Sequence, residues 1–149
     1  SDATKQIAPA LQDYLDLNFS VLVDAVRQDA HNAATPVLVH GYDVPTARDA
    51  PALSGGSAWL YAAYRKNGID ASLWPALTAQ LFGALGDTVE GWVELHAGVI
   101  SVPTVGLLTP AAAGSTGSSG DWLNEIHPNG KGWRKLARVW ADALEAALA

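Results

Sequence analysis

The residue types that could carry out acid–base chemistry are densest in one stretch, DWLNEIHPNG, at residues 121–130. His127 lies at its centre. An imidazole changes charge near neutral pH, and Pro128 restricts the backbone beside it, so His127 is a candidate general base. A lone histidine beside a helix is also commonly a surface or capping residue, and at this point both interpretations stay open.

Two sets of glycine-flanked serines, SGGS at 54–57 and GSSG at 117–120, are candidate nucleophiles. Neither set directly follows an expected strand and precedes a helix, which is the arrangement that exposes a catalytic hydroxyl, so a flexible loop is the simpler interpretation. The chain has no cysteine, no phosphate-binding or dinucleotide motif, and no diagnostic metal-ligand spacing around His127. We therefore expect no cofactor and no metal site.

Four further side chains are candidates for substrate binding. Tyr42 and Asp43 follow an apolar run, and the carboxyl end of a parallel strand is where open sheets bind ligands. Trp59 and Trp122 lie in or beside loops expected on the same side, where an indole could stack on a sugar ring or pack an acyl group. The alternative is that Asp43 caps a turn and that the three aromatic side chains simply pack.

The overall composition limits the kinds of partner. The 149 residues are 49% hydrophobic and carry a formal charge of −6, so one domain is expected and attraction to nucleic acid or to anionic membranes is not. No apolar run approaches the length of a membrane span, and the start of the chain has no signal-peptide pattern, so a soluble protein is expected and its compartment stays open. The lack of methionine suggests that a segment upstream of Ser1 is missing.

Hydrophobic periodicity predicts three main helices and one short one. The helices are expected from about residue 5 to His31, at 59–66, from a cap at Ser72 to Gly86, and after Asn129 to the end of the chain. The last helix has a basic stripe, which is typical of a solvated face. A mobile loop is expected at about 111–120, where the sequence is AAAGSTGSSG.

Two strands are expected, the first at 37–42 and the second at 91–96, with weaker extended structure at 99–105. The alternation of helix and strand predicts an α/β fold in which helices flank a parallel sheet. Two strands are fewer than such sheets usually have, and an apolar strand edge would be left uncovered. We therefore expect either a homo-oligomer or a missing N-terminal segment to cover that edge.

The sequence from His127 to Gly132, HPNGKG, followed by a terminal amphipathic helix, resembles the last conserved block of the SGNH or GDSL hydrolases. The run VLVHGYD at 37–43 also resembles the penultimate strand of a bacterial subgroup. In that family an Asp-x-x-His-Pro stretch supplies the acid and the base of a Ser-His-Asp triad. The resemblance implies a flavodoxin-like α/β fold and an esterase in which His127 is the base.

Three departures from the family pattern limit that expectation. The chain has no Gly-Asp-Ser block, and the residues that form the oxyanion hole in the family cannot be identified in it. Asn124 stands at the position where the family has the acid. An amide can orient an imidazole but cannot stabilise its cation with a full charge. Asp121 could supply that charge if the loop folded back.

The sequence therefore predicts an SGNH-like hydrolase of carboxylic or carbohydrate acetyl esters, acting on a small-molecule substrate. The chain would be the C-terminal part of that fold and would lack its nucleophile. The alternative is a non-catalytic binding module on the same scaffold that assembles through its open sheet edge.

Overall fold

The computed structural model describes the backbone of residues 2–53 and 55–149 and the side chains of residues 9–53 and 55–149. The described chain is a mixed α/β protein, as expected. Its elements are, in order, α1 (Asp2–Gln28), β1 (Val37–His40), α2 (Leu60–Lys66), the 3-10 helix η1 (Ala71–Leu73), α3 (Trp74–Leu95), β2 (Val99–Val102) and α4 (Gly130–Leu148).

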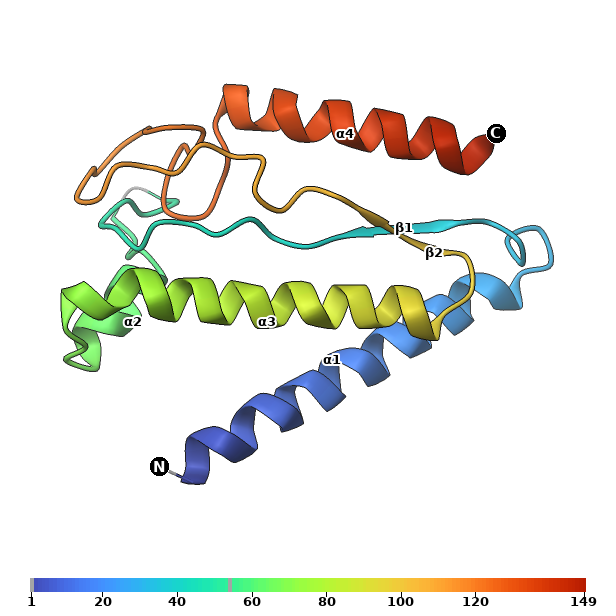
Figure 1. Cartoon of the computed structure of the whole chain (residues 1–149), viewed down its shortest axis with the longest axis horizontal. Coiled ribbons are helices and arrows are strands. Elements are labelled where there is room, and N and C mark those ends of the chain that lie inside the picture. Colours follow the sequence, from blue (N-terminus) through green and yellow to red (C-terminus); the bar gives the residue numbers. More distant parts are fainter. Residues whose placement is uncertain (1, 54) are drawn as a thin grey trace.

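The two strands form a parallel pair in the middle of three layers. Val37 lies opposite Val99 and His40 lies opposite Val102. The Val37 N–H donates to the Gly98 carbonyl at 2.9 Å, where β2 begins. Figure 1 shows α4 on one side of the strands and α3 on the other, with α1 running away from α3 towards the N-terminus. The parallel pairing requires a long crossover connection, and α3 supplies it.

The apolar residues that are buried form two small clusters rather than one continuous core. Near the start of the strands, Phe19 of α1 stacks on Trp92 of α3 with ring centroids 4.1 Å apart, beside Val23 and Val99. The second cluster gathers residues from the loops and from α4, namely Leu108, Ala111, Trp122 and Leu136. This second cluster supports the loops that follow the carboxyl ends of the strands.

The prediction of a strand at 91–96 was wrong, because those residues form the last turns of α3. Trp92 and Val93 pack against the α1 cluster, and a short apolar run does not by itself distinguish a buried strand from a buried stretch of helix. Gly86 does not end the helix either. The second strand lies instead within the weaker extended segment, and Gly98 with φ +75° makes the turn into it.

The remaining elements are of the type predicted from the sequence, but some of them begin or end at other residues than predicted. α1 begins at Asp2 and ends at Gln28, with Pro9 inside it rather than in its first turn. β1 ends at His40, and the first helical turn before α3 is capped by Asp70, whose carboxylate accepts the Ser72 N–H at 2.8 Å. The short helix α2 and the terminal helix α4 are confirmed.

The glycine- and serine-rich segment at 111–120 is anchored in the structure at several points. The guanidinium of the buried Arg48 donates to the carbonyl and the hydroxyl of Ser115, both at 3.2 Å, and to the Gly117 carbonyl. Ala111 is buried in the loop-side cluster. The mobility of this segment stays a prediction.

Candidate functional site

The loop that carries His127 is fixed against the start of α4 by a close backbone approach. The Asp121 carbonyl accepts the Asn129 N–H at 2.8 Å, and a side chain added at Gly132 would place its Cβ 2.4 Å from that carbonyl. Only glycine allows this approach. The Asn129 side chain caps the helix by accepting the N–H groups of Lys131 at 2.9 Å and Gly132 at 3.2 Å. The HPNGKG sequence therefore sets where His127 stands.

Asn124, one of the two residues expected beside the base, contacts the His127 ring. Its Oδ1 accepts the backbone N–H groups of Ile126 at 3.0 Å and His127 at 2.8 Å, which closes a tight turn. The imidazole Nδ1 lies 3.1 Å from Asn124 Nδ2 and 3.2 Å from Asn124 Oδ1. The amide is buried, whereas the imidazole is exposed at the surface of a pocket.

This amide contact allows two tautomers of His127. If Nδ1 accepts from the amide N–H, the ring proton is on Nε2, which then cannot act as a base. If Nδ1–H donates to Oδ1, Nε2 is free to accept a proton. A carboxylate in place of Asn124 would accept only and would allow only the second, base-competent form.

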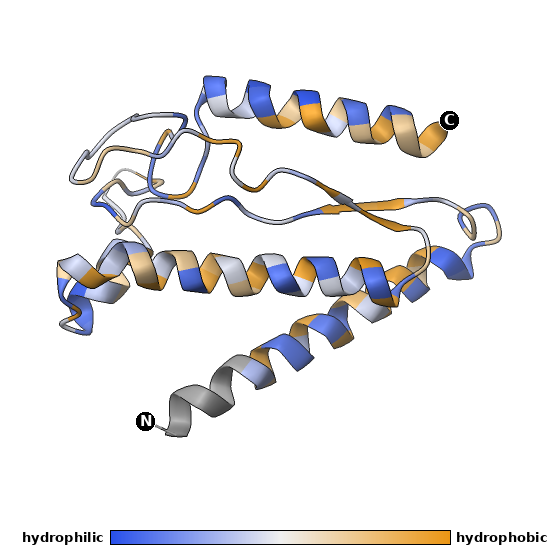
Figure 2. Cartoon of the chain, viewed as in Figure 1, coloured by the Kyte–Doolittle hydropathy of each residue, from blue (hydrophilic) through white to orange (hydrophobic). Residues whose placement is uncertain are grey.

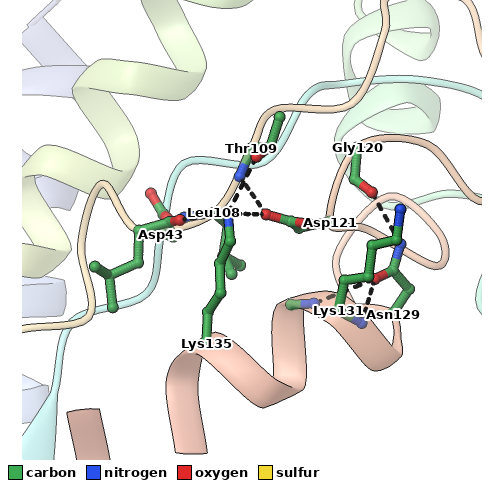
Figure 3. A network of polar contacts seen from close by, with 10 residues as sticks. Asp43, Leu108, Thr109, Gly120, Asp121, Asn129, Lys131 and Lys135 are labelled. Carbon is green, nitrogen blue, oxygen red and sulfur yellow. Dashed lines mark hydrogen bonds and ion pairs between the residues drawn. The ribbon is translucent and has the colours of Figure 1, made fainter. Parts of the chain in front are cut away.

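Asp121 is held elsewhere and has no hydrogen bond to His127. Its Oδ2 accepts the Thr109 N–H at 2.7 Å and forms an ion pair with Lys135 of α4. Figure 3 shows this contact, and in the same view the Asn129 cap. The hydrogen bond from Lys135, with that from Thr109, lowers the pKa of Asp121 to about 2. Asp121 thus ties the loops to α4, and Asn124 is the residue that contacts the imidazole.

His127 faces a pocket of about 570 Å³ at the carboxyl end of β1. The pocket lies between α3 and α4, and most of the side chains that line it are apolar. Its apolar walls include Phe82 and Leu85 from α3 and Leu136, Ala137 and Trp140 from α4. Its size and polarity match those of small-molecule sites in proteins.

The four predicted binding residues Tyr42, Asp43, Trp59 and Trp122 all line this pocket together with His127. Trp59 is 69% exposed and free to contact a ligand, whereas Trp122 is 1% exposed and forms part of the wall. The Tyr42 hydroxyl donates to the Ile126 carbonyl, and burial raises its pKa, which keeps it protonated. The structure therefore brings these residues together.

Asp43 joins the loops that follow the two strands. Its carboxylate accepts the N–H groups of Val44 at 2.8 Å, Gly106 at 3.0 Å and Leu108 at 2.8 Å. These contacts match the alternative that Asp43 caps a turn. At the pocket, its role is to hold backbone in place.

The sequence did not indicate the role of Glu125, which is next to Asn124 and almost completely buried. Its carboxylate accepts the N–H groups of Trp59, Leu60 and Tyr61 at 2.6–2.9 Å, and so binds the start of α2, and it also accepts the Arg48 N–H at 3.2 Å. Trp59 is thereby positioned over the pocket. The partners are more than 60 residues away in sequence, so no local pattern could have revealed this contact.

The pocket contains no candidate serine nucleophile among the residues that the structure describes. Ser57 and the serines at 118 and 119 do not line it, and Ser54 lies outside the described residues. The Thr104 hydroxyl does line it but donates to the Gly41 carbonyl at 2.7 Å. Among the described side chains, those of residues 9–53 and 55–149, no three metal-binding groups come together.

No protein-family model, curated protein or solved structure matches this chain. The functional argument therefore depends on the geometry of the site. In the part of the chain that is described, no helix has both the length and the hydropathy needed to cross a membrane.

Proposed function

We propose that this pocket is the base-bearing half of an SGNH-type ester hydrolase site. His127 is the general base, Asn124 orients it through Nδ1, and the apolar walls bind the acyl part of a carboxylic ester. The observation that carries the proposal is the contact of the buried Asn124 amide with an imidazole that faces a pocket of about 570 Å³. A base placed beside a substrate cavity is the minimal arrangement for this chemistry.

The resemblance to SGNH hydrolases supports the proposal through the order of these elements along the chain. The base precedes the terminal helix, and the pocket is at the carboxyl end of parallel strands, where α/β folds of this type bind substrates. The departure at Asn124 lowers the expected rate, because the base-competent tautomer is not enforced. In this proposal the hydroxyl nucleophile of the full reaction comes from residues other than those that line the pocket.

The experiment is the hydrolysis of p-nitrophenyl butyrate by the purified chain. Without a serine, Nε2 of His127 can still deprotonate a water molecule that attacks the activated ester carbonyl, with nitrophenolate as the leaving group. We expect the wild-type rate to exceed that of His127→Ala by at least about tenfold. The matched control is His31→Ala, which removes an exposed imidazole from the turn after α1 and should leave the rate unchanged.

Equal rates for wild type and His127→Ala would reject the proposal. The second candidate, a binding module without catalysis, is favoured by the occupied Thr104 hydroxyl and by the lack of a serine in the described lining. That candidate predicts saturable binding of butyrate with no turnover of the ester above the buffer rate.

A further inference from the structure

The helix α1 packs against the rest of the chain along one side only. Phe19 stacks on Trp92 of α3, and Val23 is completely buried beside this pair. The Asp16 carboxylate accepts the Trp92 indole N–H at 2.6 Å. These three α1 residues are three or four positions apart and therefore form one side of the helix. Figure 2 shows hydrophobic residues recurring along α1, which runs away from α3 towards the N-terminus.

A second row of residues on α1, mostly apolar, faces solvent. It consists of Leu11, Tyr14, Asn18, Val21 and Ala25, all exposed, and we call these five residues the α1 seam. Their spacing alternates between three and four, so in a seven-residue repeat written a to g they take positions a and d. The residues that pack on α3 take positions b and f. These are the outer positions of a coiled coil, so the seam and the α3 contact lie on opposite sides of α1.

The exposed apolar area at the seam is enough for a specific interface. Leu17 and Leu22 flank the seam at positions g and e. Together with Leu11, Tyr14 and Val21 they are each 52–65% exposed. At roughly 100 Å² each, these five side chains present about 500 Å² on one copy. Two copies that meet along the seam bury about 1,000 Å², the area at which specific interfaces begin.

We propose that a second copy of this chain covers the α1 seam, with the two α1 helices paired in parallel about a two-fold axis. A parallel pair sets position a against position a, so the two Asn18 amides face each other and can hydrogen-bond. An antiparallel pair would set each amide against an apolar side chain. A single asparagine at position a is the signal that fixes register and oligomeric state in coiled coils.

The charges of the chain do not oppose this pairing. Over residues 10–25, Asp24 is the only charged residue at positions a, d, e or g, while Asp13 and Asp16 take outer positions. Two chains of charge −6 therefore meet along a nearly uncharged surface. An anionic lipid surface fits α1 poorly, because amphipathic helices that bind one carry lysine and arginine on their polar face.

The pairing goes beyond the proposed ester chemistry and does not depend on it. No described residue of α1 lines the pocket that His127 faces. A variant that loses the pairing should therefore keep the wild-type rate of p-nitrophenyl butyrate hydrolysis, and the two proposals can fail separately.

The first test is the mass of the chain in solution, measured by sedimentation equilibrium from about 1 to about 100 µM. We expect a twofold mass, and a melting temperature that rises with concentration because dissociation accompanies unfolding. Val21→Glu places a charge in the middle of the seam and should give a monomer with an unchanged helical circular dichroism signal, since Val21 is exposed in the single chain. Leu144→Glu is the matched control, because it changes an exposed side chain of α4, and it should stay dimeric.

The second test is disulfide cross-linking, which the cysteine-free sequence makes selective. Val21→Cys sets two thiols opposite each other at position d, and air oxidation should join them in a covalent dimer. Gln12→Cys, at the outer position b, should stay uncross-linked under the same conditions. This comparison also applies if Val21→Glu fails to fold.

A wild-type monomer at 100 µM would overturn the proposal, whether or not the seam then binds lipid vesicles or an added helical peptide. A dimer that persists in a folded Val21→Glu variant would overturn it as well. Equal cross-linking of Val21→Cys and Gln12→Cys would exclude the parallel pair.

Discussion

At the scale of single residues, the proposed chemistry depends on the Asn124 side chain. Its amide contacts Nδ1 of His127 with a donor at 3.1 Å and an acceptor at 3.2 Å, so it stabilises both tautomers of the ring. Asn124 was one of two expected partners, with Asp121 as the other, because the resemblance to SGNH hydrolases puts the acid of the triad three positions before the histidine. The sequence could not indicate that Asp121 would be taken by Lys135, since that ion pair depends on where α4 packs.

Asn124→Asp should raise the rate of ester hydrolysis by about tenfold or more. The carboxylate accepts from Nδ1–H, enforces the tautomer with a free Nε2, and stabilises the imidazolium that forms. The backbone bonds to Ile126 and His127 survive, because a carboxylate oxygen still accepts them. The measurement is kcat for p-nitrophenyl butyrate, with Asn67→Asp as a control at a distant amide that caps the end of α2. A kcat for Asn124→Asp at or below that of the wild type would contradict the tautomer argument.

Asp121 should make the stability of the fold depend on pH in the acid range. Its pKa is about 2 in the folded protein against an ordinary 3.8, so the unfolded chain binds the proton more readily. The ionised carboxylate therefore stabilises the fold above about pH 4, and that contribution is lost as the pH falls from about 4 to about 2. Melting temperatures of wild type and Asp121→Asn should differ at pH 6 and converge at pH 2. A difference in melting temperature that stays constant between pH 6 and pH 2 would rule out the Lys135 ion pair as the source of that difference.

At the scale of elements, the sequence predicted helices whose apolar period is long and clear, and it failed where a run is short. α4 has its cap at Asn129 and a regular apolar face, and it was predicted from these signals. The last turns of α3 contain Trp92 and Val93, which are as typical of a strand as of a buried helix. The choice between them depends on the packing of α1, which is information from another part of the chain.

The start of α2 should depend on Glu125 more than on its own sequence. Three N–H groups of that first turn donate to one buried carboxylate, and Glu125→Gln replaces one acceptor oxygen by a donor that faces them. We expect a loss of about 2 kcal/mol in the free energy of unfolding, measured by urea denaturation. Glu145→Gln, on the exposed surface of α4, should change it by less than about 0.5 kcal/mol. Similar losses in the free energy of unfolding for the two variants would show that Glu125 does not stabilise α2.

At the scale of the whole molecule, the fold has three layers whose middle layer contains two strands. A sheet of two strands was predicted from the sequence, but one of the two apolar runs behind that prediction, 91–96, is helical, and the second strand is Val99–Val102 instead. The closure of the pocket by Phe82 and Leu85 on one side and Trp140 on the other was not predicted, since it depends on how α3 and α4 pack relative to the strands. Tyr42 and Asp43 were expected on the ligand-binding side because they follow the strand, and Trp59 because of its loop, and all three line one pocket with His127.

The most direct test of the central claim is chemical rescue of His127→Gly by added imidazole in the hydrolysis of p-nitrophenyl butyrate. If His127 acts as a base at the pocket, free imidazole should occupy the vacated space and raise the rate of the variant, saturably, towards that of the wild type. The gain must exceed that seen when imidazole is added to the buffer or to the wild-type chain. A rate that rises equally in all three, without saturation, would contradict the account.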